Sequence, residues 1–224
     1  MNVLITGCSR GIGKAMLNIL LSMEEVEKVF AISSNASQLQ SNNKLVPIQA
    51  DFLSKGWELG VESAVGDYPI SVLINNAGYL YNGAIQETTL FEIDKMLAIN
   101  YKAPLQLVQS LLDNLKKGNA HIINIGSMGG YSGSVKFPGL SVYSSTKAAV
   151  ACLSECWAEE LKEFGIKSNC LALGAVNTEM LKQAFPGYQA PVSAELMAKR
   201  IIDFAFEFPG VINGKVVPFS VSTP

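Results

Sequence analysis

The sequence predicts an α/β domain in which helices cover both faces of a doubly wound, parallel, seven-stranded sheet. Short apolar runs rich in β-branched residues alternate with longer helical patterns throughout the 224 residues. The runs are almost continuously apolar, as expected for strands of a parallel sheet that is covered on both sides. With 49% hydrophobic and 16% charged residues, the chain can also form a large buried core.

Seven segments are expected to be strands because they are short, rich in β-branched residues and bounded by turn residues. They are residues 3–6, 29–33, 45–49, 71–75, 121–126, 167–173 and 215–219. No repeat, low-complexity tract or linker interrupts the alternation, so residues 1–224 are expected to form a single domain.

Helices are expected between the strands, and two of them carry N-terminal capping signals. Thr89 with Glu92 forms a capping box that opens a helix toward Asn100. Ser193 precedes a helix that runs to about residue 206. The other helices are expected over residues 11–22, 53–66, 105–118 and 142–164, and glycines interrupt the second of these.

The charge distribution gives no reason to expect a nucleic-acid or membrane partner. The formal net charge is −2, and Lys116 and Lys117 form the densest basic cluster. Residues 1–7 run directly into a strand pattern, and no segment approaches the roughly 20 apolar residues of a membrane helix. A cytoplasmic location is therefore expected.

Four cysteines and one histidine make a metal centre improbable. Cys152 and Cys156 are four residues apart in a helical pattern, which fits neither a redox CxxC motif nor a zinc knuckle. We expect them, with Cys8 and Cys170, to be reduced and mostly buried. His121 opens a strand and is expected to be structural.

A glycine-rich turn, TGCSRGIG at residues 6–13, joins the first strand to a helix. Such a turn lets backbone N–H groups approach a pyrophosphate, and the helix N-terminus adds a favourable dipole. The spacing G-x-x-x-G-x-G differs from the G-x-G-x-x-G fingerprint. A tight turn that only packs the helix against the sheet is the alternative.

The end of the second strand indicates which dinucleotide would bind. An NAD site usually has an acid there for the ribose 2′-hydroxyl, but residues 31–35 contain no carboxylate. Arg10 and Ser34 could instead contact a 2′-phosphate, which favours NADPH over NADH. The alternative for Arg10 is a solvated surface charge.

Tyr143 and Lys147 lie four residues apart near the start of a long helix, so they share one helical face. A nearby ammonium favours the phenolate, so we expect Lys147 to lower the pKa of Tyr143 and to suit it to acid/base chemistry. Ser127 and residues 75–78 end two strands at the same edge as the glycine-rich turn. Taken singly, these residues could also be solvated helix or loop positions.

Together, these motifs resemble the short-chain dehydrogenase/reductase family over essentially the whole chain. The matches occur in order: residues 6–13, Asp51, residues 75–78, Asn100, Ser127, Tyr143 with Lys147, and residues 169–178. The resemblance implies a Rossmann-like fold and a single dinucleotide-binding oxidoreductase domain that acts on a small carbonyl or alcohol.

The resemblance also implies roles for individual residues. Tyr143 would exchange a proton with the substrate oxygen, Ser127 would hydrogen-bond the carbonyl, and Lys147 would bind the nicotinamide ribose. Asn100 would hold a water next to Lys147; its alternative is a helix kink or cap. The residues expected to contact the cofactor are Gly7, Ser9, Arg10, Gly11, Ile12, Gly13, Ser34, Asp51, Phe52, Asn76, Ala77, Gly78, Tyr143, Lys147, Val176 and Thr178. Asp51 could instead, or also, cap the next helix.

Three features depart from the family pattern. Leu173 replaces the usual proline before Gly174, and we expect this to loosen the backbone beside Val176 and Thr178. Tyr143 follows Ser127 by 16 residues, a longer spacing than usual, and the connection from Thr178 to Ser193 is short enough to imply a small lid over an open pocket. The expected pocket walls are apolar, which favours an apolar or aromatic carbonyl: Leu80, Met128, Tyr131, Phe137, Met180 and Phe185.

The compact chain looks most like the sniffer-type carbonyl reductases and the C-factor-like bacterial members of the family. A carbonyl reductase or alcohol dehydrogenase is the leading interpretation. A catalytically silent NADP-binding sensor and an epimerase or dehydratase on the same scaffold are the alternatives. The resemblance further implies a homodimer or homotetramer that pairs the helices at residues 101–117 and 142–164.

Overall fold

The central feature of the computed structural model, which describes residues 1–39 and 42–221, is a parallel seven-stranded sheet. Its order is β3-β2-β1-β4-β5-β6-β9, so the chain winds outward in both directions from β1, as predicted. The strands are β1 (Asn2–Thr6), β2 (Lys28–Ser33), β3 (Leu45–Gln49), β4 (Val72–Asn75), β5 (His121–Ser127), β6 (Lys167–Leu173) and β9 (Val216–Phe219).

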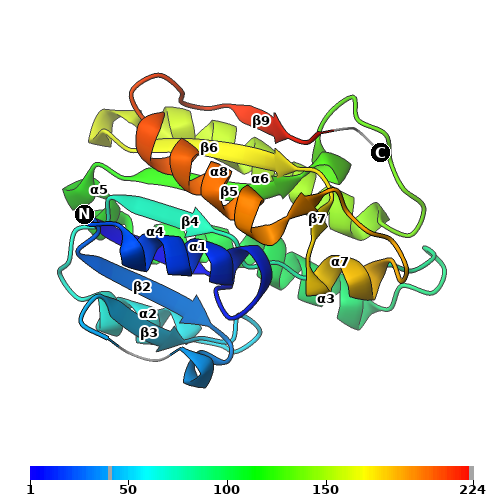
Figure 1. The fold of residues 1–224 in the computed structure, drawn as a ribbon, viewed down its shortest axis with the longest axis horizontal. Coiled ribbons are helices and arrows are strands. Elements are labelled where there is room, and N and C mark those ends of the chain that lie inside the picture. Colours follow the sequence, from blue (N-terminus) through cyan, green and yellow to red (C-terminus); the bar gives the residue numbers. More distant parts are fainter. Residues whose placement is uncertain (40–41, 222–224) are drawn as a thin grey trace.

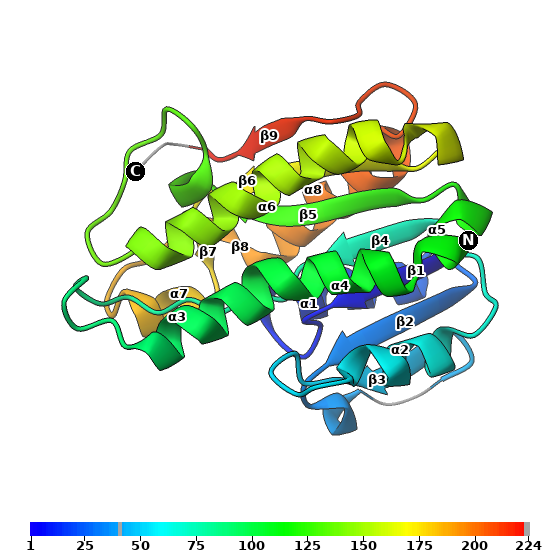
Figure 2. The same cartoon turned by 180° about the vertical axis from the view of Figure 1, so that it is seen from behind.

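Helices cover both faces of this sheet and enclose two separate cores (Figures 1 and 2). On one face, α1 (Gly11–Ser22) and α8 (Ala194–Glu207) pack on the central strands. On the other face lie α2 (Trp57–Val65), α4 (Ala103–Ser110), α5 (Leu112–Gly118) and α6 (Ser141–Glu160). This double cover explains why the strands are almost continuously apolar.

The predicted helix caps are confirmed. Thr89 Oγ1 accepts a hydrogen bond from Glu92 N at 3.3 Å before α3 (Leu90–Leu97), and Ser193 Oγ accepts one from Leu196 N at 3.2 Å. The two helices expected on either side of residues 100–105 are joined without a break. A π-helical turn, η2 (Ala98–Lys102), carries α3 into α4.

The small lid expected between Thr178 and Ser193 has secondary structure that was not predicted. It consists of a two-stranded parallel ladder, β7 (Val176–Asn177) with β8 (Val192–Ser193), and a short helix between them, α7 (Glu179–Ala184). Thr178 caps α7 by accepting a hydrogen bond from Leu181 N at 3.3 Å. Two-residue strands give no periodic signal, and a six-residue helix is too short for its apolar face to be recognised.

The prediction that the cysteines are mostly buried is wrong for two of the four. Cys8 and Cys170 are buried, whereas Cys152 and Cys156 are exposed, and all four are free thiols. The apolar pattern of α6 extends around more of the helix than the sheet covers, so its outward side remains accessible in this chain.

His121 lies at the amino end of β5 and is only 2% exposed. Its Nδ1 lies 3.0 Å from Ala205 O, and its Nε2 lies 2.9 Å from Asn169 Nδ2. A neutral ring with its proton on Nδ1 satisfies both contacts. His121 therefore joins β5, β6 and α8, far from the carboxyl edge of the sheet.

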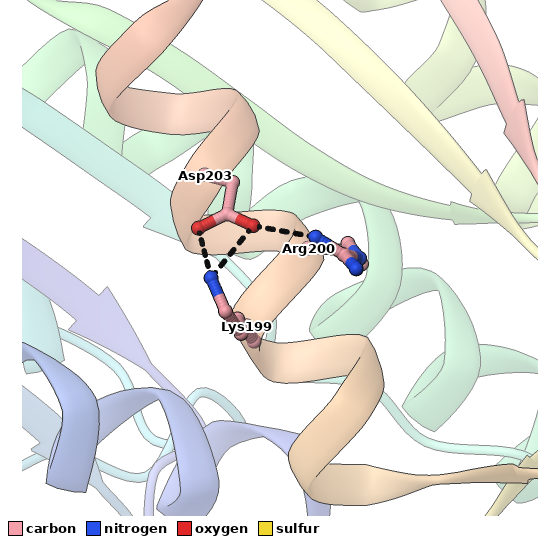
Figure 3. A network of polar contacts seen from close by, with 3 residues as sticks. All are labelled: Lys199, Arg200 and Asp203. Carbon is pink, nitrogen blue, oxygen red and sulfur yellow. Dashed lines mark hydrogen bonds and ion pairs between the residues drawn. The ribbon is translucent and has the colours of Figure 1, made fainter.

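The outer face of α8 carries surface ion pairs (Figure 3). Asp203 contacts Lys199 at 3.0 Å and Arg200 at 3.1 Å, and these hydrogen bonds lower the pKa of Asp203. Exposed pairs of this kind contribute only a few tenths of a kcal/mol each. Within residues 1–39 and 42–221, no helix is both long and apolar enough to cross a membrane.

Candidate active site

A cavity of about 720 Å³ opens at the carboxyl edge of the sheet, between the glycine-rich turn, the end of β5, the start of α6 and α7. All the residues expected to contact a cofactor line it, as do Ser127, Tyr143 and Lys147. Figure 1 shows the strand arrowheads pointing toward α3 and α7 at this end of the molecule. Residues far apart in the sequence therefore converge where a doubly wound sheet binds ligands.

The glycine-rich turn leaves room for a ligand because side chains are sterically excluded from it. Gly7 and Gly11 have φ values of +70° and +54°, which disfavour other residues. A Cβ on Gly13 would lie 2.1 Å from Gly7 O. Next to this turn, Asn76 Nδ2 donates to Thr6 O and Gly7 O, both at 3.0 Å. The turn is thus a fixed backbone cradle that fits a pyrophosphate.

The two residues expected to contact a 2′-phosphate, Arg10 and Ser34, lie at one cavity. Ser34 and Arg10 line it with exposed side chains, and no carboxylate follows β2 before residue 36. Asp51 Oδ1 accepts a hydrogen bond from Leu53 N at 3.0 Å. The alternative role of Asp51 as a helix cap is wrong, because α2 begins only at Trp57 and Asp51 shapes the preceding turn.

The three residues predicted to form the reacting end, Ser127, Tyr143 and Lys147, lie together in the structure. Ser127 Oγ accepts a hydrogen bond from Gly129 N at 3.1 Å, which fixes the hydroxyl at the end of β5. Tyr143 is half-buried in the first turn of α6 and hydrogen-bonds with the Ser127 side chain. Lys147 is 4% exposed, and its Nζ donates to Ile125 O at 2.7 Å.

The expected lowering of the Tyr143 pKa is wrong for this structure. Burial raises the pKa of Tyr143 to about 12, although the hydrogen bond from Ser127 opposes the rise. Lys147 Nζ lies 5.9 Å from the ring centroid of Tyr143, and burial lowers the pKa of Lys147 to about 8. The four-residue spacing brought the two groups onto one face, but loss of solvent outweighs their mutual effect.

Asn100 lies behind this site and does not line the cavity described above. Its Nδ2 donates to Tyr79 O at 2.9 Å and to Thr146 Oγ1 at 3.0 Å, and its Oδ1 accepts from Tyr79 N at 2.8 Å. The residue sits in the π-helical turn, as π-bulges at functional sites often do. Asn100 therefore ties the loop after β4 to α6, and its role toward water stays a prediction.

A buried polar chain holds the strand ends in register below the cavity. Asn75 Nδ2 donates to Asn124 Oδ1 at 2.8 Å, and Asn124 Nδ2 donates to Ser154 Oγ at 2.8 Å. These bonds join β4, β5 and α6. Sequence reasoning assigned no role to Asn124 or Ser154, although a buried asparagine in an apolar strand requires hydrogen-bond partners.

The backbone after β6 is tied rather than loosened. Gly174 N donates to Phe219 O at 3.0 Å, and Leu173 is 7% exposed in the core. A Cβ on Gly174 would lie 2.3 Å from Ser220 Oγ, so the residue directly after β9 packs on this glycine. The expectation that losing the proline loosens this segment is wrong, because pairing with β9 replaces the constraint.

The walls of the substrate end are mostly apolar. Five of the six expected wall residues line the cavity, but Tyr131 is not among its lining residues. Sequence reasoning missed further lining residues on the lid and nearby: Lys95, Leu140, Glu179, Leu181 and Tyr188. Most of them belong to the lid, whose helix had not been predicted, although the position of Glu179 directly after Thr178 was a usable signal.

Comparison with known proteins gives consistent results. Residues 1–189 match the family model described as short chain dehydrogenase. An uncharacterised oxidoreductase of Staphylococcus saprophyticus is 32% identical over 189 residues, covering 80% of this chain and 75% of that protein. The L-xylulose reductase of Caenorhabditis elegans is 32% identical over 191 residues, covering 80% and 72%.

Solved structures resemble the fold over nearly its whole length. The structure of ElxO with NADP bound is 28% identical, with a TM-score of 0.81 over 98% of this chain and 96% of that one. The 3-ketoacyl-(acyl-carrier-protein) reductase of Brucella melitensis complexed with NADH has a TM-score of 0.84 over 98% and 96%. At 19% identity, the second comparison shows the fold alone.

Proposed function

We propose that this chain, which belongs to the short-chain dehydrogenase family, is an NADPH-dependent reductase of apolar carbonyl compounds, with Tyr143 as the proton donor. Family membership makes it an oxidoreductase that uses a pyridine nucleotide. The observation that carries the finer proposal is the convergence of the glycine cradle, Ser127 and Tyr143 on one cavity.

The residues that would hold the cofactor fall into two groups. The backbone of the glycine-rich turn would bind the pyrophosphate, while Arg10 and Ser34 would contact the 2′-phosphate. Lys147 lies beside Tyr143 and is assigned to the nicotinamide half, and Thr178, which lines the same cavity, is assigned to it by the family resemblance. The preference for NADPH is supported by the missing carboxylate after β2 and by Arg10.

When bound, the nicotinamide supplies the hydride. The protein's own groups then handle the substrate oxygen. Ser127 donates a hydrogen bond to it, and Tyr143 transfers its phenolic proton as negative charge develops there. Because burial raises the pKa of Tyr143 to about 12, the phenol carries its proton at neutral pH. This protonation state is the one that a proton donor needs at the start of carbonyl reduction.

The substrate end accepts an apolar group next to the carbonyl. The apolar residues Leu80, Phe137 and Leu140, and Met180 and Phe185 of the lid, line the cavity and are assigned to this end. A substrate with an aliphatic or aromatic substituent would bury that surface at about 25 cal/mol per Å². Charged substituents would lose hydration here without gaining a partner from these five residues.

A carbonyl panel with NADPH and NADH tests the proposal. We expect NADPH oxidation with apolar ketones or aldehydes, tighter binding of NADPH than of NADH, and loss of turnover in Tyr143→Phe. Tyr68→Phe is the matched control, because Tyr68 is exposed near the amino edge of the sheet. Undiminished turnover in Tyr143→Phe would refute the assigned proton donor. Firm NADPH binding without turnover in the wild type would favour the sensor instead.

Two further expectations remain proposals. A homodimer or homotetramer that pairs α4 and α6 between subunits is tested by light scattering. The cytoplasmic location is tested by cell fractionation.

A further inference from the structure

Glu179 brings a negative charge to the glycine cradle. It is the first residue of α7 and lines the same cavity as the glycine-rich turn. A Cβ on Gly11 would meet Glu179 Oε2 and Thr178 Cγ2, each at 3.5 Å. Gly11 is the first residue of α1, so the carboxylate stands beside the backbone groups that would bind a pyrophosphate.

The lid holds Glu179 in this place from both sides. Before α7, Val176 pairs with Val192, and Thr178 caps the helix. After α7, Asn82 Nδ2 donates to Ala184 O at 2.8 Å, which fixes the end of the helix to the loop after β4. The carboxylate is therefore carried by a segment anchored at both ends.

The charge of Glu179 is not neutralised in the described part of the chain. Among residues 1–39 and 42–221, neither Glu179 nor Arg10 forms an ion pair. An acidic side chain in the first turn of a helix also interacts favourably with the helix dipole, so Glu179 could have a purely structural role. Glu195 offers the comparison, because it occupies the first turn of α8 behind a serine cap and does not line the cavity.

We propose that Glu179 sets the cofactor affinity of this site by opposing the charge of the pyrophosphate. The inference rests on the proposed function, since it requires a dinucleotide in the cradle. Glu179 is exposed, so its repulsion of the pyrophosphate is screened by solvent, but two like charges a few ångströms apart still repel by about 1 kcal/mol. Glu179 therefore weakens binding and favours release of the oxidised cofactor after each turnover, and product release limits the rate of many enzymes.

The test compares the dissociation constants of NADPH for the wild type, Glu179→Gln and Glu195→Gln, measured by tryptophan fluorescence quenching. We expect Glu179→Gln to bind NADPH roughly tenfold more tightly. This is the order of magnitude expected when one negative charge beside the doubly charged pyrophosphate is removed. The gain should shrink between about 0.1 M and about 1 M salt, where the Debye length falls from about 10 Å to about 3 Å. Glu195→Gln should match the wild type.

A second probe, adenosine 2′-monophosphate, lacks the pyrophosphate and should bind wild type and Glu179→Gln equally. If Glu179→Gln bound adenosine 2′-monophosphate more tightly by the same factor as NADPH, the placement of Glu179 beside the pyrophosphate would be overturned. Unchanged or weaker NADPH binding by Glu179→Gln, or a gain that high salt leaves intact, would overturn the electrostatic role. Failure of the wild type to bind either NADPH or NADH would instead refute the proposed function.

Discussion

Replacing Lys147 by methionine probes the electrostatics of the reacting end. Lys147 is 4% exposed, and burial lowers its pKa from 10.5 to about 8. Methionine is similar in length and carries no charge, so the variant removes the buried ammonium and keeps most of the packing. Its effect on stability should therefore depend strongly on pH.

The sign follows from proton binding. Between pH 8 and pH 10.5 the unfolded chain binds more protons at this residue than the folded chain, so wild-type stability rises with pH in that window. At neutral pH both states are protonated, and burying the charge costs about 3 kcal/mol. Ile125 O loses its donor in the variant, which costs about 1–3 kcal/mol at any pH.

At neutral pH the relief of burying the charge offsets the lost hydrogen bond, so the free energy of unfolding of Lys147→Met should equal that of the wild type or exceed it by up to about 2 kcal/mol. By about pH 10 the cost of burying the ammonium in the wild type has fallen to roughly 1 kcal/mol. The stability of the variant relative to the wild type should therefore fall by about 2–3 kcal/mol between neutral pH and pH 10. Urea denaturation of the cofactor-free protein at both pH values measures this shift. Lys102→Met, an exposed lysine, is the control. A difference between variant and wild type that does not change with pH would refute a buried Lys147 with a lowered pKa.

Three other predictions concern the cradle, the lid and the base of the sheet. Gly13→Ala should abolish NADPH binding, because the added Cβ would lie 2.1 Å from Gly7 O. The control Gly60→Ala has open space around the added Cβ, so it should bind NADPH normally, and its free energy of unfolding should rise by roughly 0.5–1 kcal/mol because alanine is favoured over glycine inside α2. Asn82→Ala removes the hydrogen bond that holds the end of α7, so it should raise KM for the carbonyl several-fold and change NADPH affinity less. An unchanged KM would contradict the role of Asn82 in anchoring the lid. Burial lowers the pKa of His121, so stability should fall as pH drops below about 6.5, and a His121→Gln variant should lose this slope in thermal denaturation.

The fold could be predicted because its signals are local and repeated. Each main strand is a short apolar run, and the caps at Thr89 and Ser193 act within one helical turn. A small lid after Thr178 was predicted, but its strands were not, since β7 and β8 are two residues each and gain their pairing only from the tertiary fold. The exposed side of α6 was missed because apolar residues around a helix do not reveal how much of it the sheet covers.

Most residues that meet at the cavity were predicted from the sequence, whereas the direction of the Tyr143 pKa shift was not. Strand ends that share one edge of a parallel sheet must meet, so the positions of Ser127, Tyr143 and the glycine turn followed from their order. The chain Asn75–Asn124–Ser154 depends on packing between elements distant in sequence, so no local pattern pairs these residues.

The pKa of Tyr143 shows why proximity alone did not decide the chemistry. Sequence spacing places an ammonium near the phenol, which argues for a lowered pKa. The fold buries both groups, and desolvation penalises each charged form, so the phenol and the amine both shift toward neutrality. A phenol that keeps its proton can donate it to a developing alkoxide, whereas alcohol oxidation first requires that proton to leave. The same burial that defeats the simple electrostatic expectation therefore leaves the phenol protonated before the cofactor binds, which is the state that the proposed proton donor requires.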